Sequence, residues 1–133
     1  DNNCRPYPNC LIDIWQANTY GKYNHKNDYS DNELDKNFNG YKKIVANSEG
    51  FYSFTTILPG SYKISNSILR PPHIHLLIKT KSNKSLTTQL YFKGHPLNKN
   101  DFILNSINNK SLLEVSLVKS ENNIRKAIFN III

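Results

Sequence analysis

The chain has 133 residues, of which 38% are hydrophobic. Residues 1–133 therefore suit one globular domain with a core of its own. No stretch approaches the roughly 18 consecutive apolar residues of a membrane span, and no charged-then-apolar leader of a signal peptide opens the chain. The net charge is +7, but the lysines are scattered. This favours a solvated basic surface suited to anionic small molecules over a nucleic-acid partner.

The N-terminal residues leave two questions open. The sequence begins at Asp1 and contains no methionine, so we expect the full protein to have residues upstream of it. Its localisation stays unknown, with the cytoplasm slightly favoured over export. Cys4 and Cys10 flank Pro6 and Pro8 and either form a small disulfide loop after export or stay thiols in the cytosol.

Hydrophobic alternation predicts a first strand over Leu11 to Trp15, with Ile12 and Ile14 on one face. Residues 16–31 follow without a period of 2 or 3.6 and predict a long loop. Loops of this length inside a compact domain are usually functional or disordered, and the three tyrosines in this one argue against disorder.

Turn-forming residues separate the next predicted strands. Segments 41–46 and 51–57 flank the four turn formers Asn47 to Gly50 and predict a hairpin. The Pro59-Gly60 turn then leads into a short extended segment over 61–64.

The C-terminal half continues the same pattern. Residues 86–92 alternate as a strand, and 94–109 predict a loop with one helical turn near 101–104. Segments 112–118 and 124–133 predict a second hairpin. Seven to eight short strands at this spacing predict an all-β fold, an antiparallel β-sandwich with long functional loops.

The predicted strand over Leu69 to Leu76 carries the clearest chemical pattern. Alternate side chains share a face, so the Cα atoms of His73 and His75 lie about 6.6 Å apart and both imidazoles can reach one metal ion. Pro71-Pro72 keeps the segment extended and places Arg70 near the start of the strand. Taken alone, such a histidine pair more often lies on a half-exposed polar face.

Further metal ligands must come from elsewhere, because no cysteine or carboxylate lies nearby at a zinc-binding spacing. Tyr62 follows a turn and Tyr23 lies in the long loop, and polar residues flank both. Ionising a phenol at neutral pH costs roughly 4 kcal/mol. A ferric ion offsets that cost better than zinc or magnesium does. As an alternative, both tyrosines pack as ordinary half-buried aromatics.

Seven sequence blocks between about Cys4 and Asn98 occur in an order that resembles the intradiol ring-cleavage dioxygenases. The likeness is greatest to the protocatechuate 3,4-dioxygenase branch. The blocks are Trp15–Asn18, Gly21–Asp28, Leu34–Phe38, Asn47–Phe54, Pro59–Tyr62, Arg70–His75 and Thr88–Phe92.

This resemblance implies a non-haem Fe(III) with O₂ as co-substrate. The implied ligands are Tyr23, Tyr62, His73 and His75. Tyr62 is implied to be the axial ligand that leaves when a catechol binds and helps take up its proton, while Tyr23 stays bound. Arg70 is implied to stabilise the anionic substrate form that reacts with O₂, and Gln89 to hydrogen-bond in the same pocket. Taken alone, Arg70 fits an ordinary ion pair and Gln89 an exposed strand position.

The implied reaction cleaves a catechol-type ring between its two hydroxylated carbons and gives a muconate. The identity of the catechol stays open, because Ile64 stands where relatives commonly have tryptophan and His95 replaces the usual aspartate of a Gly-Asp-Pro sequence. Members of the family commonly assemble, and oligomeric state also stays open. The alternative function is a non-catalytic, transthyretin-like β-sandwich module that binds a metal or an aromatic ligand.

Overall fold

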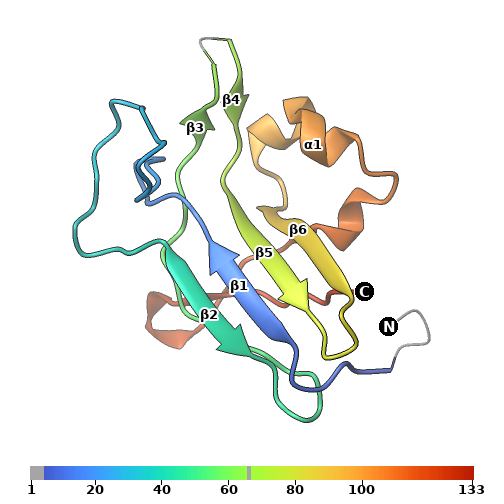
Figure 1. Cartoon of the computed structure of the whole chain (residues 1–133). Helices are drawn as coiled ribbons and strands as arrows, with labels where there is room; N and C mark the ends of the chain where they lie inside the picture. The colour runs from blue at the N-terminus through green and yellow to red at the C-terminus, as the bar shows by residue number, and fades with distance from the viewer. Residues whose placement is uncertain (1–4, 66) are drawn as a thin grey trace.

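One five-stranded sheet forms the body of the protein (Figure 1). The computed structural model describes residues 5–65 and 67–133. The order of the strands in the sheet is β2-β1-β5-β6-β7. Their bounds are β1 Leu11–Trp15, β2 Tyr41–Val45, β5 His73–Lys79, β6 Ser85–Phe92 and β7 Glu114–Val115.

The remaining elements are short. Two two-stranded sheets pair β3 Tyr62–Lys63 with β4 Leu69–Arg70, and β8 Val118–Lys119 with β9 Arg125–Lys126. The helical turns are η1 Pro96–Asn100, α1 Phe102–Asn105, η2 Lys110–Leu112 and η3 Glu121–Asn123. No helix in the described part of the chain is long and apolar enough to cross a membrane.

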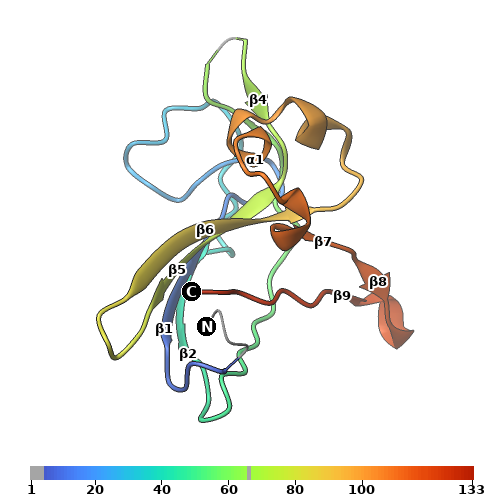
Figure 2. The same ribbon diagram turned by 90° about the vertical axis from the view of Figure 1, so that its right-hand side faces the viewer.

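The core lies on one face of the main sheet. Alternating residues of β1 and β5 are buried there, as the period of two requires: Ile12, Ile14, Ile74, Leu76 and Ile78. Figure 2 shows two extended segments, around residues 51–60 and 124–133, running across this face of the sheet. Tyr52 Oη donates to Phe129 O at 2.7 Å and joins the two segments.

The all-β prediction is confirmed, but the arrangement is not a regular antiparallel sandwich. β7 pairs with β6 in parallel, while the other pairs of the main sheet are antiparallel. The layer opposite the sheet consists mainly of extended segments, where the described residues form only the β8–β9 ladder.

The predicted hairpin of 41–46 with 51–57 is wrong in its second half. The turn forms, with Asn47 Oδ1 accepting from Phe51 N at 2.9 Å. Residues 51–57 then form no strand, because Tyr52 and Phe54 pack against the core from the opposite layer.

Two other predicted segments divide. The strand expected over 69–76 breaks into β4 and β5 at Pro71-Pro72, since neither proline can donate a ladder hydrogen bond. The second hairpin forms only between β8 and β9. Cys10 is buried, and its thiol donates to Tyr7 O at 3.4 Å. The sequence leaves a disulfide with Cys4 and two free thiols both open, and Cys4 lies outside the described residues.

Candidate metal centre

Strand β5 presents the two histidines on the face of the sheet opposite the core. His75 lies opposite Trp15 of β1 and Gln89 of β6. Its ring stacks on Trp15, with centroids 4.9 Å apart and planes 4° from parallel. His73 is 2% exposed, and its Nδ1 lies 2.7 Å from Pro71 O. A proton on Nδ1 makes this hydrogen bond and leaves the Nε2 lone pair free to bind a metal.

The two tyrosines bring their hydroxyls to the same point from outside the main sheet. Tyr23 Oη lies 3.1 Å from His75 Nε2, and Tyr62 Oη lies 3.4 Å from His73 Nε2. The two Nε2 atoms are themselves 3.1 Å apart. The two phenol rings meet edge to face, with centroids 5.1 Å apart. The structure therefore brings together all four side chains that the sequence nominates as metal ligands.

Close backbone packing holds the two tyrosine-bearing segments together. A Cβ on Gly60 would lie 2.3 Å from Thr19 O, and one on Gly21 would lie 2.1 Å from Ser61 O. Gly21 also has φ +80°, which glycine adopts most readily. The carbonyl of buried Asn18 accepts hydrogen bonds from the N–H groups of both glycines, at 3.0 and 2.8 Å.

Arg70 lies buried beside the four side chains. Its NH1 is 3.2 Å from His73 Nε2 and 3.4 Å from Tyr62 Oη. The other side of the guanidinium forms an ion pair with Asp101, with Nε to Oδ2 at 2.8 Å. NH2 donates to Gln89 Oε1 and to Tyr91 Oη, each at 2.7 Å.

The spacing of the four donor atoms fits a metal ion. Metal–ligand bonds of about 2.1 Å at angles of 90–109° put neighbouring donor atoms roughly 3.0–3.4 Å apart, and the observed separations are 3.1, 3.1 and 3.4 Å. No cluster of three or more His, Cys, Asp or Glu side chains suitable for a metal occurs among residues 5–65 and 67–133. A four-donor site here needs both tyrosines, a donor set that suits a hard, highly charged cation.

Comparison with known proteins gives the same family as the sequence blocks. The whole chain, residues 1–133, matches the family described as Dioxygenase. It is 43% identical over 100 residues to the protocatechuate 3,4-dioxygenase beta chain of Burkholderia cepacia, covering 73% of this chain and 43% of that protein. The chain belongs to the intradiol dioxygenase family.

Other members of the intradiol family show the extent of the likeness. The catechol 1,2-dioxygenase of Acinetobacter baylyi is 31% identical over 115 residues, covering 77% of this chain and 36% of that protein. The structure of 3-chlorocatechol 1,2-dioxygenase from Rhodococcus opacus 1CP superposes with a TM-score of 0.76 at 28% identity, covering 96% of this chain and 53% of that one. The chain spans less than half the length of the curated relatives described here.

Burial shifts the pKa of His73, His75 and Tyr23 in this intradiol family member. Burial, and next the nearby Arg70 charge, lower the pKa of His73 to about 4. Burial, and next His73, lower the pKa of His75 to about 3. Burial, and next Tyr62, raise the pKa of Tyr23. Both imidazoles are therefore neutral at pH 7 and ready to bind a metal, while Tyr23 ionises only with a cation beside it.

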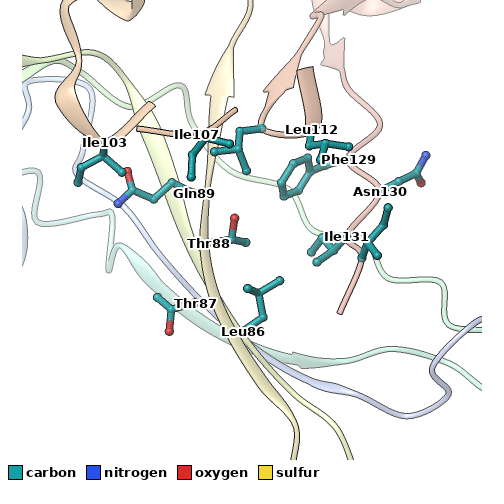
Figure 3. Close-up of a pocket in the computed structure, with 12 residues that line it drawn as sticks. Leu86, Thr87, Thr88, Gln89, Ile103, Ile107, Leu112, Phe129, Asn130 and Ile131 are labelled. Carbon is teal, nitrogen blue, oxygen red and sulfur yellow. The ribbon is translucent and has the colours of Figure 1, made fainter. Parts of the chain in front are cut away.

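Gln89 lies behind Arg70, at the edge of an apolar pocket of about 310 Å³. Figure 3 shows its carboxamide beside Ile103 at one end of this pocket. Its Oε1 accepts hydrogen bonds from Arg70 NH2 and from Tyr91 Oη. Gln89 thus reaches the four metal-ligand candidates through Arg70.

The tyrosines also line an open cleft of about 1260 Å³. Tyr20, Ile64 and Leu69 line it beside them, and Ile64 is 47% exposed. The lining mixes these apolar side chains with polar ones, and a cleft of this size can accommodate an aromatic ring.

Sequence reasoning did not identify Asp101, Tyr91 or Trp15 as part of this site. Tyr91 had a weak signal, since it alternates with Gln89 on the same face of a predicted strand. Asp101 had none, because it lies 31 residues from Arg70 in the sequence, in a predicted helical turn.

Proposed function

We propose that this chain is the metal-binding part of an intradiol dioxygenase that cleaves a catechol-type ring with O₂. The observation that carries the proposal is the convergence of two phenol oxygens and two imidazole nitrogens, in which each atom lies 3.1–3.4 Å from a neighbouring one in the order Tyr62, His73, His75, Tyr23. Arg70 NH1 lies against the same group at 3.2 Å. The names of the relatives support this reaction class and extend to more than one catechol.

The residues that would hold a ferric ion are Tyr23, Tyr62, His73 and His75. When bound, the ion supplies Lewis acidity that favours the catecholate form of the substrate and its reaction with O₂. The neutral histidines contribute nitrogen lone pairs, and the tyrosines contribute negative charge as phenolates.

Two side chains of the site have roles toward the substrate. Tyr62 Oη is the group that takes up a proton from a catechol hydroxyl as the substrate binds. Arg70 keeps its charge at any working pH, and its NH1 lies 3.4 Å from Tyr62 Oη. From there it stabilises the negative charge that develops on the ring during attack by O₂. Both atoms of O₂ enter the product, and the bond between the two hydroxylated carbons breaks.

The open cleft beside the tyrosines is the proposed path for the substrate. Its lining combines aromatic and aliphatic side chains such as Tyr20 and Leu69 with polar ones. The net charge of +7 also favours the approach of anionic aromatics by electrostatic attraction.

Oxygen uptake by the ferric-loaded protein tests the proposal. We expect consumption of O₂ with at least one of protocatechuate, catechol and hydroxyquinol. One molecule of a muconate-type product should form for each O₂ consumed. Metal-free protein and the Arg70→Lys variant are the controls, and both should be at least tenfold slower. Tight binding of catechols without any O₂ uptake would favour the alternative, a non-catalytic binding module.

A further inference from the structure

The guanidinium of Arg70 is held from behind by groups that the proposed reaction does not use. Its side chain is 4% exposed and that of Asp101 is 0% exposed. A buried charge of this kind needs a closely matched partner, and a planar guanidinium can donate from two of its nitrogens to one carboxylate. Here Nε lies 2.8 Å from Oδ2, and NH2 lies 3.2 Å from Oδ1.

The two oxygens of Asp101 have different partners. Oδ1 accepts from Leu104 N at 2.8 Å and so caps helix α1, and it also lies 3.1 Å from Tyr91 Oη. Oδ2 is bonded to Arg70 Nε. Oδ1 is therefore shared between the helix cap and Arg70 NH2, while Oδ2 bonds only to the guanidinium.

Neighbouring side chains restrict the guanidinium further. Phe102, the residue after Asp101, places its ring 5.7 Å from Arg70 Cζ, within reach of a cation–π contact. Tyr91 Oη accepts from NH2 at 2.7 Å and donates to Gln89 Oε1 at 2.6 Å. With Nε and NH2 bound in this way, NH1 is the nitrogen that faces Tyr62 and His73.

We propose that Asp101 is a positioning residue that turns Arg70 NH1 toward the reaction site, with Tyr91 as its accessory. This inference rests on the proposed function, because it concerns the residue that stabilises the reacting substrate. Asp101 acts through Arg70 and does not itself contact the candidate metal ligands.

Asp101→Asn is the most selective test. Asparagine keeps an oxygen to cap α1, but it places an N–H group where Oδ2 accepted the proton of Arg70 Nε. We expect kcat to fall roughly 10- to 100-fold, the cost of a misplaced catalytic group, while KM changes less than about threefold. Iron content should stay near that of the wild type, while thermal stability should fall, because the buried Arg70 charge loses its anionic partner.

A second readout needs neither iron nor turnover. The sequence contains three arginines, so the Nε–H signal of Arg70 can be assigned in a ¹H–¹⁵N spectrum of the metal-free protein from its loss in Arg70→Lys. We expect slow hydrogen exchange for this signal in the wild type and fast exchange in Asp101→Asn. The matched control is Glu114→Gln, which makes the same change of charge at a carboxylate bonded to Asn98 and not to Arg70.

Tyr91→Phe provides an independent variant. It removes one hydroxyl from the network, and we expect kcat to fall roughly three- to tenfold, with Glu114→Gln unchanged. If both Asp101→Asn and Tyr91→Phe keep the wild-type kcat and slow Nε–H exchange, the positioning role of Asp101 is overturned. The proposed function is unaffected by that result. Absence of turnover by the ferric-loaded wild type would overturn the proposed function, and this inference with it.

Discussion

The two halves of the candidate metal centre are built in different ways. His73 and His75 lie on β5, which pairs with β6 from His73 onward and with β1 from His75 onward. Tyr23 lies in a loop, and Tyr62 lies on a strand of only two residues. The histidine half is therefore fixed by regular backbone ladders, while the tyrosine half depends on turns and close contacts around Gly21 and Gly60.

This difference indicates how the site gains its order. Sheet registry fixes the two imidazoles before any metal arrives, which favours binding because little freedom is lost. The phenols approach from a separate part of the chain, and they must also lose their protons. We therefore expect the histidine half to determine whether a metal binds at all, and the tyrosine half to determine which metal binds and what it can do.

Removing one proposed ligand from the histidine half should have the largest effect. Removal of a side chain that hydrogen-bonds to a metal ligand typically lowers metal affinity roughly 10- to 100-fold. In His75→Ala, we expect a larger fall in iron affinity and loss of oxygen uptake. Metal analysis after competition with a chelator measures this. His95→Asn is the control, because asparagine can keep the cap that His95 gives to η1. Wild-type iron content in His75→Ala would show that His75 is not a ligand.

The pH dependence of the metal-free protein tests the buried state of the same two histidines. The pKa of each lies below the ordinary 6.5, at about 4 for His73 and about 3 for His75. Each group thus contributes stability that is present above pH 6.5 and is lost as pH falls toward these values. We expect unfolding free energy to fall by a few kcal/mol between about pH 6.5 and about pH 4. An equal slope in His75→Ala, measured by denaturant titration, would contradict this account.

Single changes in the tyrosine half should have smaller effects on binding. We expect Tyr62→Phe to keep some iron, with an altered spectral response to added catechol and roughly tenfold or greater loss of turnover. Tyr23→Phe should weaken the visible absorption while the histidines still bind metal. Tyr20→Phe, in the same cleft, is the comparison variant for a phenol without a metal role. Unchanged spectra and turnover in Tyr62→Phe would show that Tyr62 is not one of the ligands.

Disturbing the contact between the two tyrosine-bearing segments should have the smallest effect. Gly60→Ala places a Cβ 2.3 Å from Thr19 O, so the backbone must shift. We expect a several-fold loss of iron affinity, with the histidine pair intact. Gly94→Ala is the control for backbone strain without a steric clash, since Gly94 has φ +82° and a Cβ there meets no atom within 4 Å. Equal iron affinities of both variants, measured by chelator competition, would show that this contact does not order the tyrosines.

The same difference explains how much of the fold the sequence predicts. Alternating patterns identify β1, β5 and β6 well, because one face of each strand is buried and the period of two is strict. The pattern of 51–57 is equally strand-like, yet these residues cross to the opposite layer. Local alternation shows that a segment has a buried face and does not show which partner covers it.

The candidate site divides in a similar way. The spacing of His73 and His75 alone nominates a pair of ligands. The tyrosines required the ordered resemblance, because nothing local marks Tyr23 among the three tyrosines of its loop. Only the folded structure places Asp101 at the site, because its ion pair with Arg70 depends on the path of the chain after β6.

Visible absorption of the ferric-loaded protein tests the central claim most directly. If Tyr23 and Tyr62 both bind the ion, tyrosinate-to-iron charge transfer should give a burgundy protein. The band should weaken in each single Tyr→Phe variant and disappear in the double variant. A wild-type protein that binds one ferric ion per chain and stays colourless would contradict the proposed centre.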